Sequence, residues 1–69
     1  MSYEELLKIA GVARLEAMEE QMQMLSPDDV GRKAYREISG LYNRFGETGD
    51  MACFEAVADK LAAVTGCRI

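Results

Sequence analysis

Hydrophobic residues recur every three or four positions in three stretches of the chain, and this spacing is typical of amphipathic α-helices. The stretches cover residues 2–25, 27–45 and 51–65. No stretch alternates apolar and polar residues with the period of two that a half-buried strand requires. The pattern therefore predicts an all-α fold with three helices in a single domain over residues 1–69.

The first stretch carries more apolar surface than one helix ordinarily shows. Projected at about 100° per residue, its apolar side chains fall on two neighbouring stripes that span roughly 240°, against about 100° for a surface helix. One stripe holds Leu6, Ile9, Ala10, Ala13, Ala17 and Met24, and the other holds Leu7, Leu15, Met18, Met22 and Leu25. One small chain can hardly cover both stripes. We therefore expect a homodimer, intertwined or side by side, with the second stripe at its interface.

Capping residues mark the expected helix ends. Ser2 is placed to cap the first helix, and the pair Ser26–Pro27 ends that helix and begins the next. Gly46 is expected to end the second helix, while Asp50 and Gly66 bracket the third. Because the first connection is so short, the first two helices should form an antiparallel hairpin, to which the third helix adds.

Length and charge narrow the function further. A domain of 69 residues buries a small core, and chains of this size often gain stability by associating. The net charge of −4 argues against direct nucleic-acid binding, which needs a basic surface. It permits contact with a basic protein surface, although acidity also serves solubility alone. Residues 1–29 carry seven acidic and two basic side chains, whereas residues 30–46 carry one acidic and four basic ones.

Catalytic and metal-binding chemistry finds little support in the sequence. The chain has no His, so Cys53 and Cys67 lack an imidazole partner for nucleophilic catalysis or a zinc site. We expect both to be free thiols in a cytoplasmic protein, without cofactor, metal or membrane span. A helix-turn-helix DNA-binding reading of the last two helices is disfavoured, because Glu55 and Asp59 on the second of them would repel phosphates.

The best candidate for binding another protein lies on the second helix. Tyr35 and Tyr42 stand seven residues apart at the edge of the apolar stripe, with Ser39 between them and Arg32 and Arg36 beside them. Tyr and Arg dominate the energetics of protein interfaces. The alternative is that both tyrosines only cover the core with their hydroxyls in water.

In length, acidity, helical pattern and the surplus apolar arc from Leu6 to Leu25, the chain resembles the small anti-quorum-sensing proteins of Pseudomonas phages. The resemblance implies a dimeric, phage-encoded inhibitor in the host cytoplasm. Its target would be a LuxR-type quorum-sensing transcription regulator, and also a pilus-assembly ATPase. The alternative prediction is a small helical chaperone or a structural subunit of a larger complex.

Overall fold

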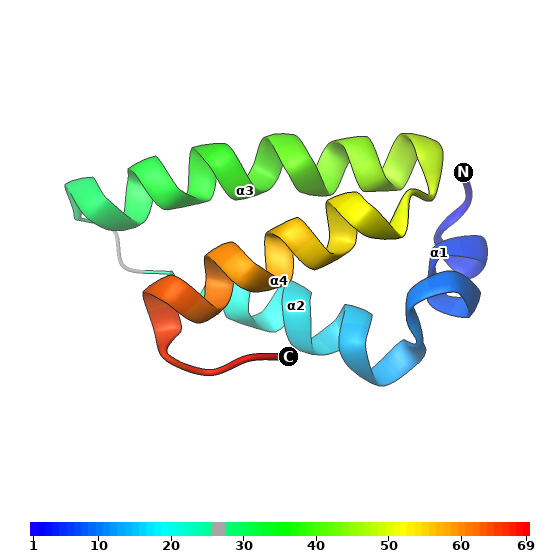
Figure 1. Ribbon diagram of the computed structural model, residues 1–69, viewed down its shortest axis with the longest axis horizontal. Coiled ribbons are helices and arrows are strands. Elements are labelled where there is room, and N and C mark those ends of the chain that lie inside the picture. The colour runs from blue at the N-terminus through cyan, green and yellow to red at the C-terminus, as the bar shows by residue number, and fades with distance from the viewer. Residues whose placement is uncertain (26–27) are drawn as a thin grey trace.

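Four α-helices make up the fold, which a computed structural model describes for residues 1–25 and 28–69 (Figure 1). They are α1 (Tyr3–Ala10), α2 (Val12–Gln23), α3 (Asp29–Thr48) and α4 (Met51–Thr65). The described residues contain no strand, which confirms the all-α class. None of these helices is long and apolar enough to cross a membrane.

The predicted first helix is in fact two helices, because Gly11 interrupts it. Gly11 has φ 94° and ψ 137°, a backbone conformation that side-chain-bearing residues rarely adopt. Its N–H donates to the Leu7 carbonyl and its own carbonyl accepts from the Leu15 N–H. The chain therefore turns sharply while its backbone hydrogen bonds remain satisfied. The single projection of residues 3–25 was wrong, since it assumed one continuous axis.

This break explains how part of the apolar surplus is covered within one chain. Along α1 the buried residues are Leu6 and Ala10, which belong to the first stripe. Along α2 they are Leu15 and Met18, which belong to the second stripe. The turn at Gly11 thus brings parts of both stripes to one core, where Leu15 and Met18 are 0% exposed within a single chain. These two residues are therefore covered without a second chain, and the homodimer itself stays a prediction.

The second predicted helix also has different ends. Ser26 and Pro27 lie outside the described residues, and the cap observed for α3 is Asp28, whose Oδ1 accepts from the Gly31 N–H at 2.8 Å. At the other end, α3 continues through Gly46 to Thr48. The left-handed residue that ends it is Gly49, with φ 69°. The sequence has two glycines in this region, Gly46 and Gly49, and the predicted helix end at Gly46 was wrong.

The start of α1 and both ends of α4 match the caps that the sequence predicts. The Ser2 hydroxyl accepts from the Glu5 N–H at 3.3 Å, and Asp50 Oδ1 accepts from the Ala52 N–H at 2.9 Å. Gly66 ends α4 in the left-handed conformation, with φ 78°. The predicted helix 51–65 is therefore confirmed residue for residue.

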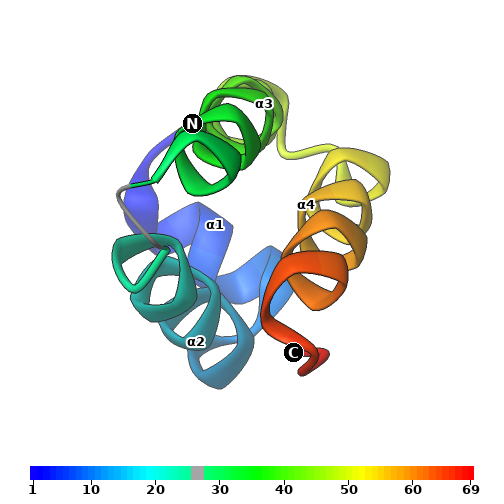
Figure 2. The same cartoon turned by 90° about the vertical axis from the view of Figure 1, so that its left-hand side faces the viewer.

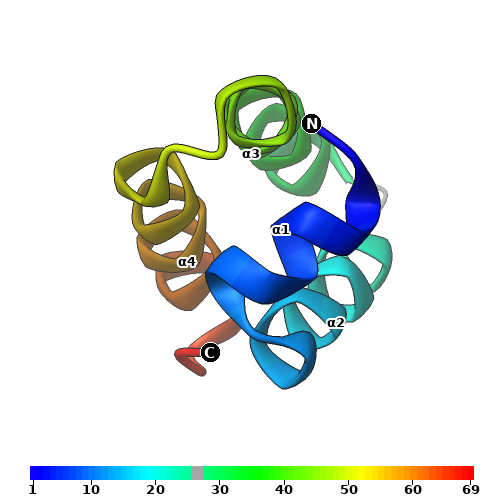
Figure 3. The same ribbon diagram turned by 90° about the vertical axis from the view of Figure 1, so that its right-hand side faces the viewer.

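The four helices are arranged around a common centre in the two end-on views (Figures 2 and 3), and their buried side chains form one hydrophobic core. The most extensive packing joins α3 and α4, which run antiparallel, rather than the first two predicted helices. Phe45 and Phe54 meet between them with ring centroids 5.2 Å apart and planes at 58°. The Arg14 guanidinium of α2 lies 4.9 Å from the centre of the Phe54 ring and covers it.

Ion pairs lie on the α4 side of the molecule. Arg14 pairs with Glu55 at 2.9 Å, and Arg68 contacts both Glu55 and Asp59. Lys60 of α4 pairs with Glu37 of α3 at 3.4 Å. All are surface pairs, so each contributes little to stability. The carboxylates in these pairs are Glu37, Glu55 and Asp59.

Candidate protein-binding groove

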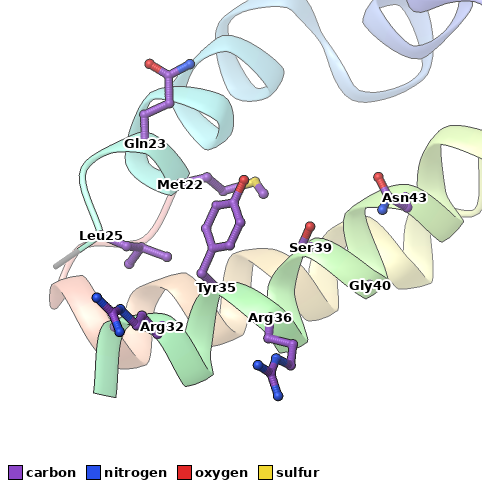
Figure 4. Close-up of a pocket in the computed structure, with 10 residues that line it drawn as sticks. Met22, Gln23, Leu25, Arg32, Tyr35, Arg36, Ser39, Gly40 and Asn43 are labelled. Atoms are coloured by element: carbon purple, nitrogen blue, oxygen red, sulfur yellow. The ribbon is translucent and has the colours of Figure 1, made fainter. Parts of the chain in front are cut away.

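An open groove of about 930 Å³ runs between the C-terminal part of α2 and the outer side of α3 (Figure 4). Three kinds of residue line it: apolar or aromatic, cationic, and small or amide-bearing. They are Met22, Gln23, Leu25, Gly31, Arg32, Tyr35, Arg36, Ser39, Gly40 and Asn43. A concave surface with an apolar part and a few polar groups is typical of a binding site.

Four of the five residues predicted to bind a partner line this groove: Arg32, Tyr35, Arg36 and Ser39. The fifth, Tyr42, lines a smaller hollow of about 230 Å³ that continues from the groove. The two hollows share Met22, Gln23 and Tyr35, so they form one surface. The structure therefore brings the predicted binding residues together.

The predicted dimer-interface residues separate into three groups. Leu15 and Met18 belong to the core of the chain. Leu7 of α1 is partly buried against that core. Met22 and Leu25 also pack partly on the core, but they line the groove as well. They contribute to the same surface as the predicted partner-binding residues.

Tyr35 divides the groove from its extension. It is 47% exposed, and its ring projects from α3 toward the α2 side of the groove (Figure 4). Ser39 and Asn43 project to the same side, while Arg36 extends from the opposite edge of α3. Tyr35 therefore offers a half-exposed ring to a ligand, whereas Tyr42 packs partly on the core, as the alternative role predicted for both tyrosines requires.

Tyr42 is held by an acidic residue of α2. Its hydroxyl donates to Glu19 Oε1 at 2.6 Å, and the Tyr3 hydroxyl donates to Glu19 Oε2 at 3.1 Å. Burial, followed by the hydrogen bond to the Glu19 carboxylate, raises the pKa of Tyr42 well above its ordinary value. The pKa of Tyr3 is raised by the same causes. Glu19 thus joins α1, α2 and α3 at one end of the groove.

The two arginines of the groove have no acidic partner among the described residues. The cations of the described ion pairs are Arg14, Lys60 and Arg68, and not Arg32 or Arg36. Both Arg32 and Arg36 are exposed. Their guanidinium groups are therefore free to bind a carboxylate, with the two-pronged geometry that suits this group.

A gap in the side-chain surface of α3 deepens the groove at Gly40. A Cβ placed on Gly40 would meet no atom within 4 Å, and its φ is not positive. Next to it, Ser39 offers a short side chain. The backbone of α3 is therefore open to a neighbouring chain here, and a larger side chain fits without distorting the helix.

The predicted site residues do not include four of the residues that line the groove, namely Gln23, Gly31, Gly40 and Asn43. Two of them could have been found from helix geometry. Gly40 lies four residues after Arg36, and Asn43 lies four residues after Ser39, so they share a face with predicted residues. Gln23 could not be placed, because the projection of α2 ignored the break at Gly11.

Other kinds of site are poorly supported. Within residues 1–25 and 28–69, no three His, Cys, Asp or Glu side chains are grouped so that they could hold a metal ion. Cys53 and Cys67 are free thiols, as expected. The exposed acidic residues that argued against DNA binding, Glu55 and Asp59, both contact Arg68.

Comparison of the chain with protein-family models, with curated proteins and with solved structures finds no match. The groove and its charges are therefore the basis for a functional proposal.

Proposed function

We propose that the chain is a small non-enzymatic protein that binds another protein through the groove between α2 and α3 and inhibits it by occupying its surface. The observation that carries this proposal is the composition of the groove. Apolar and aromatic side chains lie beside Arg32 and Arg36, which form no ion pair with the residues that the structure describes. Met, Tyr and Arg are enriched at protein interfaces.

The resemblance to phage anti-quorum-sensing proteins supplies the first targets to test. They are a LuxR-type quorum-sensing regulator and a pilus-assembly ATPase, which the protein would meet in the host cytoplasm if a phage encodes it. In this proposal, inhibition follows from occupancy of the target's surface. This proposal includes no nucleic acid, cofactor, metal or membrane.

A homodimer remains part of the proposal, with a smaller interface than the sequence suggested. Leu15 and Met18 are fully buried in the core of one chain. A second chain would therefore contact Met22 and Leu25, which line the groove. A dimer formed there would compete with a foreign partner. We therefore expect dimerisation, if it occurs, to weaken when the groove is filled.

The second candidate is a chaperone or structural subunit with a constitutive partner. The same groove supports it, because a permanent partner would also cover Met22, Leu25 and Tyr35. The two candidates differ in the partner: an inhibitor reduces the activity of a protein that works without it, whereas a subunit is needed by its partner.

Filling the groove tests the proposal. Gly40→Leu adds an apolar side chain in the open space of the groove, and it should improve helix propensity rather than harm the fold. Tagged wild type and Gly40→Leu are used to capture proteins from a bacterial lysate, and the eluates are quantified by mass spectrometry. We expect a near-stoichiometric partner with wild type and at least a tenfold loss with Gly40→Leu.

Two controls separate groove filling from other effects. Gly40→Ala changes the same position by one methyl group and should retain most of the captured partner. Ala63→Leu adds similar apolar surface to an exposed position of α4 that does not line the groove, and it should capture normally. Equal capture by wild type and Gly40→Leu would reject the groove as the binding site.

A further inference from the structure

The charge on the groove is opposite to the charge of the whole molecule. The chain carries a net charge of −4, yet the charged residues that line the groove are Arg32 and Arg36. The cations elsewhere that pair with carboxylates, Arg14, Lys60 and Arg68, lie outside it. The groove is therefore a local site for negative charge on a molecule that otherwise repels it.

The dimensions of the groove fit a short helix. On α3 the lining residues run from Gly31 to Asn43, which corresponds to about 18 Å at 1.5 Å per residue. Arg32 and Arg36 are four residues apart, so their Cα atoms lie about 6 Å apart along the axis. Carboxylates one turn apart on a partner helix have the same spacing.

The apolar part of the groove requires an amphipathic partner. Met22, Leu25 and the Tyr35 ring supply its apolar surface, and Met adapts to irregular shapes with little strain. Where Gly40 and Ser39 leave the α3 backbone open, a partner helix can come close. The described residues contain no strand, so no sheet edge is offered to an extended peptide.

We propose that the groove binds an acidic amphipathic helix of the partner protein, with its apolar residues on Met22, Leu25 and Tyr35 and two carboxylates, one turn apart, on Arg32 and Arg36. This inference rests on the proposed function and specifies the chemistry of the partner. DNA-contacting surfaces are basic, so in a transcription regulator the bound segment would be a different, acidic one.

Synthetic peptides test this chemistry directly. We would use fluorescein-labelled 18-residue helical peptides with Leu at positions i, i+3, i+4 and i+7 and flanking Glu residues one turn apart. A matched peptide has Lys at each Glu position, and a scrambled Glu peptide keeps the composition without the apolar stripe. Binding is measured by fluorescence anisotropy at about 0.05 M and 0.15 M salt, where screening lengths differ.

The matched peptides distinguish the groove from the overall charge. A protein with a net charge of −4 should prefer the Lys peptide if long-range attraction decides binding. The proposed groove should instead bind the Glu peptide at least tenfold more tightly than the Lys peptide and the scrambled peptide. The double variant Arg32→Glu/Arg36→Glu should instead bind the Lys peptide more tightly than the Glu peptide. This reversal would support both arginines as the residues that bind the carboxylates.

Charge reversal elsewhere on α3 is the matched control. Lys33→Glu/Arg44→Glu changes the net charge by the same amount at exposed residues outside the groove, and it should reduce binding of the Glu peptide less than threefold. Circular dichroism of both double variants checks that the helices persist. Gly40→Leu should abolish binding of the Glu peptide.

The outcomes separate this inference from the proposed function. Preference for the Lys peptide, with loss of its binding in Gly40→Leu, would overturn the acidic partner and leave the groove as a binding site. If neither amphipathic peptide binds at about 200 µM, the inference that the groove binds an acidic amphipathic helix is overturned. The lysate capture would still test whether the groove binds a protein partner. Equal binding of the scrambled Glu peptide would reduce the site to charge alone and also overturn the inference.

Discussion

The Tyr42 hydroxyl donates a 2.6 Å hydrogen bond to Glu19 Oε1, and this bond joins α3 to α2 where the groove narrows into its extension. Tyr3 of α1 donates to the other oxygen of the same carboxylate. The two walls of the groove are therefore held at a fixed separation by one acidic side chain. Tyr42 contributes to the site by positioning these walls, in addition to presenting its ring to the extension.

Removing this hydroxyl should weaken the fold moderately. We expect Tyr42→Phe to lower the free energy of unfolding by about 1 kcal/mol, because a partly buried hydrogen bond to a charged acceptor is lost. Tyr3→Phe should have a smaller effect, since its bond is exposed and longer. Urea denaturation followed by circular dichroism measures both. Equal losses of unfolding free energy in Tyr42→Phe and Tyr3→Phe would contradict the larger contribution expected from the Tyr42 hydroxyl.

The same bond predicts a dependence on alkaline pH. The pKa of Tyr42 is raised in the folded protein above the ordinary value of 10.0, mainly by burial and then by Glu19, so folding favours the neutral phenol. This contribution to stability is complete below about pH 10 and is lost as the pH rises further. Wild type should therefore lose more stability than Tyr42→Phe between about pH 10 and 12. If the free energy of unfolding falls in parallel with pH for wild type and Tyr42→Phe, the assignment of the pH dependence to the Tyr42 hydroxyl would be contradicted.

The break at Gly11 should be sensitive to a single methyl group. Gly11→Ala should lower the free energy of unfolding by about 1–3 kcal/mol, because φ 94° is unfavourable for alanine. Gly40→Ala is its matched control: both positions have open space around the added Cβ, but Gly40 has no positive φ. Gly40→Ala should be neutral or stabilise by up to about 1 kcal/mol. Thermal unfolding of wild type, Gly11→Ala and Gly40→Ala measures the two changes in stability.

Core substitutions separate folding from association. Leu15→Ala should cost about 2–5 kcal/mol, since Leu15 is fully buried within one chain, and Leu15→Glu should unfold it. Light scattering coupled to size exclusion measures mass, while circular dichroism measures helicity. A Leu15→Glu protein that becomes monomeric with full helicity would show that Leu15 lies at an interface, against the structure.

Local signals predicted helix type and several ends well. Ser2, Asp50 and Gly66 act on backbone groups only a few residues away, so their roles can be recognised without the tertiary structure. Gly11 and Gly46 show where this fails. A glycine inside a helical pattern is compatible with continuation, as at Gly46, or with a break, as at Gly11. Sequence spacing alone does not distinguish these two cases.

The site was predicted in part for the same reason. Arg32, Tyr35, Arg36 and Ser39 share one side of a long continuous helix, so a projection of α3 groups them correctly. The opposite wall comes from α2, whose orientation depends on the turn at Gly11. The sequence therefore did not predict that Met22 and Gln23 of α2 face Tyr35 across a groove, because that arrangement depends on the backbone angles at Gly11.

The most direct test of groove binding is a nuclear magnetic resonance titration of the ¹⁵N-labelled chain with the purified partner from the capture experiment. The account predicts that the largest amide shift changes fall in residues 22–25 and 31–43, and that Gly40→Leu removes them at the same partner concentration. Shift changes confined to α1 and α4, with the groove amides unmoved, would contradict it.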